Sequence, residues 1–126
     1  MSYYAIAFLV SFQTLTYELT LFHILNYQFS YFYGVLGLSL ALGGLGLGAA
    51  IAIPLCERSC DYAVCRAFTL FNLGLLAVPC MCLLPVPTWV SLVLLGLPYV
   101  PAGTLLSLVF ATRSTPKLYA CDMLGA

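Results

Sequence analysis

The sequence has few charged residues: only 6% of its 126 residues are Asp, Glu, Lys or Arg, and the formal net charge is zero. Soluble domains usually carry about a quarter charged residues. Nucleic-acid binding requires Lys and Arg gathered on one surface. The scarcity of charge therefore excludes a broad nucleic-acid-binding surface and disfavours an ordinary soluble domain.

Two other features are missing. No Lys or Arg precedes the first apolar stretch and no small-residue cleavage site follows it, so the N-terminus is not a typical signal peptide. Cys56, Cys60 and Cys65 are spaced by four and five residues and lack the tight CxxC pair of most zinc or iron–sulfur sites. We expect no metal and no cofactor, and we interpret these thiols as small interfacial residues in a reducing compartment.

What the sequence does contain is apolar: 63% of its residues are hydrophobic. A small soluble domain cannot bury that much apolar surface, whereas a transmembrane helix needs about 20 mainly apolar residues. Four segments qualify, at roughly 4–25, 31–55, 67–84 and 89–111, with prolines inside the last two. The sequence predicts one all-α domain over residues 1–126, an integral membrane bundle of about four transmembrane helices.

The basic residues predict the orientation of this bundle. Arg58 and Arg66 fall between the second and third spans, and Arg113 and Lys117 follow the fourth. Short cytoplasmic loops are enriched in Lys and Arg. With four spans, both places lie on one side of the membrane, so we expect the N-terminus and the C-terminus to be cytoplasmic.

Glu18 and His23 are the candidate intramembrane polar residues. Glu18 lies about 20 Å along the first helix, where a carboxylate must be paired or protonated. It can form a structural hydrogen bond to Thr14 or a neighbouring helix, relay a proton or substrate, or contact a partner protein. His23 can be a proton switch, an axial ligand to a haem or chlorin, or an ordinary interfacial histidine. Their separation of five residues disfavours a direct bond.

Small residues are concentrated in the second span, at Ser39, Gly43, Gly44 and Gly48. They are not a dinucleotide-binding loop, because no strand precedes them. Gly44 and Gly48 form a GxxxG pair, and Ser39 with Gly43 forms a second small-xxx-small pair, which lets helix backbones approach closely in lipid. We predict a helix-packing surface, which serves either within the chain or between subunits.

Two stretches resemble a known family. "YELTLFHILNYQFSYFYGVLGLSLALGGLGLGAA" and "LPYVPAGTLLSLVFATRSTPKLYACDMLGA" resemble the membrane region of bacterial spermidine-synthase-like integral membrane proteins. The resemblance implies a location in the bacterial inner membrane and a further helix opening at "LYACDMLGA". It also implies that Glu18 has a basic partner five residues on. His23 stands where the family has an Arg, which would make such a pair sensitive to protons.

The resemblance further implies a soluble domain related to polyamine aminopropyltransferases, but the sequence ends at Ala126. Two alternatives stay open: the product is naturally short, or it is part of a longer protein. In both, the active site of that domain is absent from these residues, so we expect no enzymatic activity.

Three functions follow from the sequence. The first is a non-catalytic accessory or scaffolding subunit of a larger membrane complex, in contact with lipid and with other membrane subunits. The second is the membrane half of an aminopropyltransferase-like enzyme whose catalytic half lies elsewhere. The third is a small transporter component that uses Glu18 and proline-broken helices.

Overall fold

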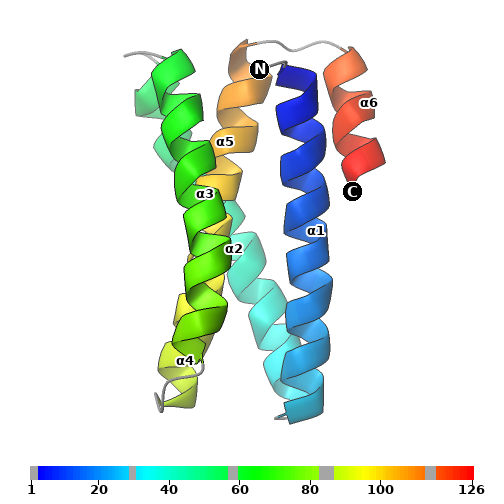
Figure 1. The fold of residues 1–126 in the computed structure, drawn as a ribbon, viewed down its shortest axis with the longest axis vertical. Coiled ribbons are helices and arrows are strands. Elements are labelled where there is room, and N and C mark those ends of the chain that lie inside the picture. The colour runs from blue at the N-terminus through cyan, green and yellow to red at the C-terminus, as the bar shows by residue number, and fades with distance from the viewer. Residues whose placement is uncertain (1–2, 29–30, 57–59, 83–86, 113–115) are drawn as a thin grey trace.

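The computed structural model describes residues 3–28, 31–56, 60–82, 87–112 and 116–126, and in this part of the chain every element is a helix (Figure 1). α1, α2, α3 and the α4–α5 stretch alternate in direction, α5 continues in line from α4, and α6 returns beside α1 (Figure 1). Their bounds are α1 Tyr3–Gln28, α2 Tyr31–Cys56, α3 Cys60–Cys82, α4 Thr88–Gly96, α5 Tyr99–Thr112 and α6 Pro116–Gly125.

Three helical stretches of the described chain are long and apolar enough to cross a membrane: Tyr3–Tyr27, Phe32–Leu55 and Trp89–Thr112. A helix suits this environment because it satisfies its own backbone hydrogen bonds where water is absent. At 1.5 Å per residue, a stretch of 24 residues is about 36 Å long and exceeds the hydrocarbon core of about 30 Å. The prediction of an all-α protein with membrane-spanning helices is thus confirmed, with three such stretches.

The third helix of the structure, α3, begins earlier than the predicted third span. The predicted spans 31–55 and 67–84 left residues 56–66 as the connection between them, but α2 continues to Cys56 and α3 begins at Cys60. Cys65 and Arg66 are therefore helical, and both are exposed. Within α3 the shorter stretch Tyr62–Ala77 is apolar. The prediction began the helix only where the charged residues stop and the apolar segment begins. The structure shows that the helix already includes the charged residue Arg66 before that segment.

The predicted fourth span is broken at its prolines. α4 ends at Gly96, and Leu97 and Pro98 form a turn before α5 begins at Tyr99. Proline has no backbone N–H and its ring clashes with the preceding turn. Around the break the backbone uses tighter bonds, with the amide of Leu97 donating to Leu94 O at 3.1 Å. Pro101 lies in the first turn of α5, where an N–H has no intrahelical partner anyway.

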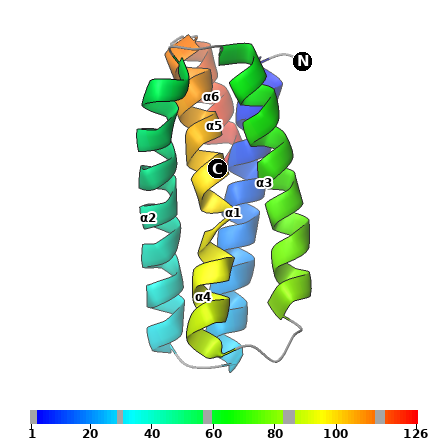
Figure 2. The same ribbon diagram turned by 90° about the vertical axis from the view of Figure 1, so that its left-hand side faces the viewer.

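α5 is the central helix of the bundle (Figure 2). Half of the Trp89–Thr112 stretch (50%) is buried, against 22% of Phe32–Leu55. α2 and α3 both pack mainly on α5 and barely touch each other, whereas α1 packs mainly on α2 and α6 and touches α5 less. The core is built around four fully buried α5 residues, Ala102, Leu105, Leu108 and Val109.

The closest approach between helices is the crossing of α2 and α5. A Cβ atom added to Gly48 would overlap Val100 O, and one added to Gly103 would lie 2.8 Å from the Leu45 Cα. The Thr104 hydroxyl lies 3.0 Å from Gly48 O and 2.9 Å from Val100 O, so it bonds across the crossing as well as within α5. Glycines on both helices let the backbones meet and place this hydroxyl within reach.

Substituting Gly48→Ala should therefore destabilise the bundle. The added methyl group meets backbone atoms, which cannot rotate away, and overpacking of this kind costs about 1–3 kcal/mol. Gly43→Ala on the same helix is the control, because no atom lies within 4 Å of its added Cβ. Unfolding in mixed detergent micelles, followed by circular dichroism, measures both. Equal stability of the two variants would refute the importance of this crossing.

Candidate functional site

α1 carries a column of polar side chains on the face that packs against the other helices. Ser11 and Thr14 are buried, and Glu18 is half-buried. Residues three and four apart share one face of a helix, so these groups form a continuous row. The exposed side of α1 carries large apolar side chains, at Phe8, Leu9, Phe12, Leu19 and Ile24. Exposed apolar side chains of this kind fit a helix whose surroundings are lipid.

The column reaches α3 through an amide pair. The Gln13 Nε2 donates to Asn72 Oδ1 at 3.5 Å, and the Asn72 amide donates to Phe68 O at 2.8 Å within α3. The Gln13 Oε1 and the Thr14 hydroxyl are buried without a hydrogen-bond partner. The predicted bond from Thr14 to Glu18 is therefore not formed.

Below this pair, two tyrosines meet at the break between α4 and α5. The Tyr17 hydroxyl donates to Leu95 O at 3.3 Å, near the end of α4. The Tyr17 and Tyr99 rings are tilted against each other with centroids 5.5 Å apart. Tyr99 is only 2% exposed, and its hydroxyl is buried without a hydrogen-bond partner. The broken helix is thus braced by aromatic side chains at the level of the polar column.

Glu18 and His23 have different surroundings. Glu18 is half-buried and close enough to Tyr99 to act on it electrostatically. His23 is exposed, because five residues rotate it well away from Glu18 around the helix. Glu18 is therefore the only one of the two that joins the interior column.

The predicted packing residues divide between two opposite faces of α2. Gly44 and Gly48 are buried against α4 and α5, and a Cβ at Gly44 would lie 2.8 Å from the Tyr99 Cβ. Ser39 and Gly43 are exposed. The Ser39 hydroxyl donates to Val35 O within its own helix at 3.0 Å. The expectation of a single packing surface was wrong. Gly43 and Gly44 are adjacent in sequence and so point in different directions, which places the two small-xxx-small pairs on different faces of α2.

α6 is attached to the top of α1 by a polar bond. The Ser11 hydroxyl donates to the half-buried Asp122 Oδ1. Close packing accompanies it, because a Cβ on Gly125 would overlap Phe8 O. The Phe110 and Tyr119 rings lie 4.8 Å apart and join α6 to α5. Asp122 is therefore a hydrogen-bond acceptor between two helices.

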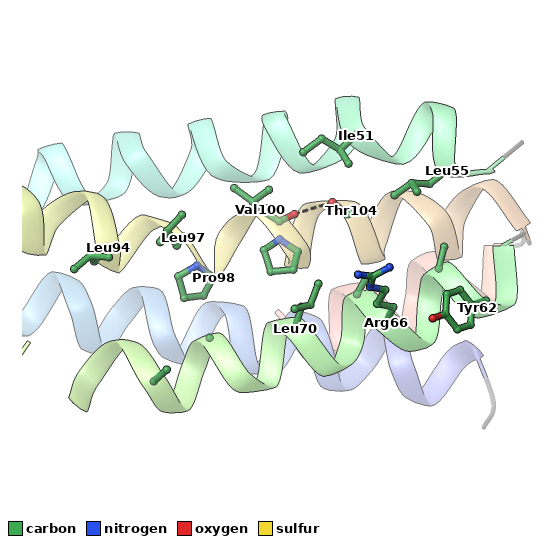
Figure 3. Close-up of a pocket in the computed structure, with 15 residues that line it drawn as sticks. Ile51, Leu55, Tyr62, Arg66, Leu70, Leu94, Leu97, Pro98, Val100 and Thr104 are labelled. Carbon is green, nitrogen blue, oxygen red and sulfur yellow. Dashed lines mark hydrogen bonds between the residues drawn. The ribbon is translucent and has the colours of Figure 1, made fainter. Parts of the chain in front are cut away.

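A lateral groove opens between α2 and α3, with α4 and α5 as its floor (Figure 3). Its volume is about 880 Å³. It exists because α2 and α3 both pack on α5 but barely touch each other. Its walls are apolar for most of their length, and the residues lining the far part include Ile51, Leu70, Leu94, Leu97 and Pro98.

Two polar side chains lie at one end of the groove. Tyr62 and Arg66, one turn apart on α3, both line it. Figure 3 shows the Arg66 guanidinium directed into the groove and the Tyr62 phenol oxygen on the side of Arg66. Among the lining residues Arg66 alone is charged. Sequence reasoning placed Arg66 in a loop and missed this groove, because the separation of two helices depends on how both pack against a third.

The cysteines are only partly described. The side chains of Cys56 and Cys60, like Glu57 and Arg58, lie outside the described residues, whereas Cys65 is exposed and Cys121 is half-buried. Across the described ranges, no three His, Cys, Asp or Glu side chains come together as a metal site. Of the predicted chemical groups, only Glu18 therefore has a place in the interior.

Replacing Ser11 with Ala should release α6 from α1. The loss leaves the half-buried Asp122 carboxylate without its donor, at a cost of about 1–3 kcal/mol. Amide hydrogen exchange in α6 should then become about tenfold faster or more, since 1.4 kcal/mol corresponds to a factor of ten. Ser39→Ala is the matched control, because that hydroxyl bonds only within α2. Unchanged exchange in Ser11→Ala would contradict the assigned bond.

A functional assignment for this chain must be argued from the geometry of its helices, because comparisons with known proteins give no match. No protein-family model, no curated protein and no solved structure matches the chain. The resemblance to spermidine-synthase-like membrane proteins thus stays a prediction from the quoted residues.

Proposed function

We propose that this chain is a non-catalytic accessory subunit of a larger membrane complex, and that it binds another membrane polypeptide through the outer face of α2. The observation that carries this proposal is a stripe of exposed small residues on that face. Ser39, Gly43, Gly46 and Ala50 are spaced by four, three and four residues and are all exposed. We call this set the outer stripe.

The outer stripe has the geometry that transmembrane helices use to associate. No atom of the chain lies within 4 Å of a Cβ added to Gly43 or Gly46. Large exposed side chains flank it, including Leu42, Leu47 and Ile53, so a second helix would fit against a shallow groove between ridges. In lipid, such small-residue surfaces let backbones approach and form van der Waals contacts.

The opposite face of α2 supports the same interpretation. There, Gly44 and Gly48 bring α2 close to α4 and α5 within the chain. The same kind of surface on the outside leaves a second close contact to be made by another polypeptide. The proposal includes descent from the membrane part of a spermidine-synthase-like protein, on the strength of the resemblance alone.

We further propose that α3 is a fourth span, with both termini on the cytoplasmic side of a bacterial inner membrane. Arg66 and Lys117 both belong to the end of the bundle that holds the start of α1 (Figure 1). At the other end lie the exposed aromatic residues Tyr27 and Trp89. Basic residues on the cytoplasmic side and interfacial aromatics are the usual pattern of such proteins.

The assembly proposal is tested with Gly43→Leu combined with Gly46→Leu. Leucine at both positions fills the outer stripe and keeps a second helix at a distance, while open space around them leaves the chain's own fold intact. Native gels of solubilised membranes should show the complex reduced and the free chain increased. Leu38→Ile, an exposed substitution of equal volume on the same helix and outside the residues that flank the outer stripe, is the control. A complex that survives the double substitution would overturn the proposal.

The orientation is tested with chains that keep one cysteine. Cys65, which is exposed, should react with a membrane-impermeant maleimide only after cells are permeabilised, because we place it on the cytoplasmic side. Tyr27→Cys, introduced at a residue that is 94% exposed at the other end, should react in intact cells. The reverse pattern would show the opposite orientation.

A further inference from the structure

We propose that the lateral groove between α2 and α3 is a binding site for an anionic phospholipid, with acyl chain along the apolar walls and phosphate at Arg66 and Tyr62. This site does not depend on the accessory-subunit proposal, which concerns the outer stripe on another face of α2. The argument rests on the groove's size, the chemistry of its lining and its length.

The groove is built for an apolar ligand. Its volume of about 880 Å³ lies within the range of about 300–1,000 Å³ that ligand sites occupy. Thr104 is the only hydroxyl group deep among the lining residues, and it already lies 3.0 Å from Gly48 O and 2.9 Å from Val100 O. Its donor is thus in use, so the apolar walls select a hydrocarbon chain over a polar molecule.

The mouth of the groove suits a phosphate. The Arg66 guanidinium points into the groove (Figure 3), and no carboxylate among the described residues pairs with it. A guanidinium presents a planar fork of donors that matches phosphate oxygens. Tyr62, one turn earlier on α3, adds a phenol on the same side. Basic pockets between transmembrane helices on the cytoplasmic side are known to bind anionic headgroups.

The length of the groove distinguishes a lipid from a partner helix. Its lining on α3 extends from Tyr62 to Ala77, and the part from Arg66 to Ala77 is about 16 Å long at 1.5 Å per residue. One leaflet of the hydrocarbon core is half of about 30 Å. A lipid whose phosphate lies at Arg66 therefore fills the groove with its chain, whereas a transmembrane helix would extend far beyond it.

The binding test uses native mass spectrometry of the purified full chain titrated with phosphatidylglycerol or phosphatidylcholine. We expect phosphatidylglycerol to bind more tightly. Arg66→Gln should weaken its binding about fivefold, the effect of one basic group near a membrane surface, and Arg66→Lys should restore part of it. Lys117→Gln, which removes an exposed cation at the same end but outside the groove, is the control. Equal binding of the two lipids, or equal losses in both Gln variants, would overturn the site.

A second pair of variants tests the apolar walls. Leu70→Trp places a bulky ring in the groove and should reduce phosphatidylglycerol binding, while Leu73→Trp lies on the exposed side of α3, outside the groove lining, and should not. Circular dichroism establishes that each variant is folded, and Arg66→Gln decides the matter if Leu70→Trp is not. If Leu70→Trp leaves lipid binding unchanged but alters the oligomeric mass, a second polypeptide occupies the groove and the lipid proposal is wrong.

Discussion

The rest of the bundle depends on the contact between the α2 and α5 backbones. In lipid no hydrophobic effect drives helices together, so close contact and interhelical hydrogen bonds must do so. Gly48 and Gly103 remove the side chains that would separate the two helices, and Thr104 bonds to Gly48 O at 3.0 Å. Because α3 packs on α5 and α1 packs on α2, the two helices that meet in this contact also hold the helices beside them.

The groove is a consequence of the same contact. α2 and α3 both pack on α5 but make few contacts with each other, so a space remains between them at the surface. The packing that closes the centre of the bundle therefore leaves one side open. Arg66 at the mouth of that opening is the one charged group among the lining residues. The opening therefore combines apolar walls with a single positive charge at one end.

Sequence patterns identified the features that depend on one helix at a time. The apolar lengths of α1 and α2 and the proline break at Pro98 depend on local composition and backbone chemistry, and they are found as expected. The start of α3 at Cys60 was missed, because charged residues can continue a helix beyond its apolar part.

Features that depend on several helices were beyond the sequence. Two such features can be found only when the neighbouring helices are known. One is that Gly44 and Gly48 are buried while Ser39 and Gly43 are exposed. The other is the hydrogen bond from Ser11 to Asp122. The same holds for Asn72 and Tyr99, which look like ordinary helix residues until Gln13 and Tyr17 are placed beside them. Glu18 was recognisable alone, because a carboxylate within an apolar helix is costly whatever surrounds it.

The break between α4 and α5 has a consequence for how the chain can cross a membrane. α4 has nine residues and is about 14 Å long, too short to cross a core of about 30 Å. Only α4 and α5 together, as the stretch Trp89–Thr112, are long and apolar enough to cross a membrane. The turn at Leu97 and Pro98 gains its partners, such as the Tyr17 hydroxyl on Leu95 O, only when α1 is beside it. The length of this stretch thus depends on its composition, whereas its broken shape also depends on contacts with a neighbouring helix.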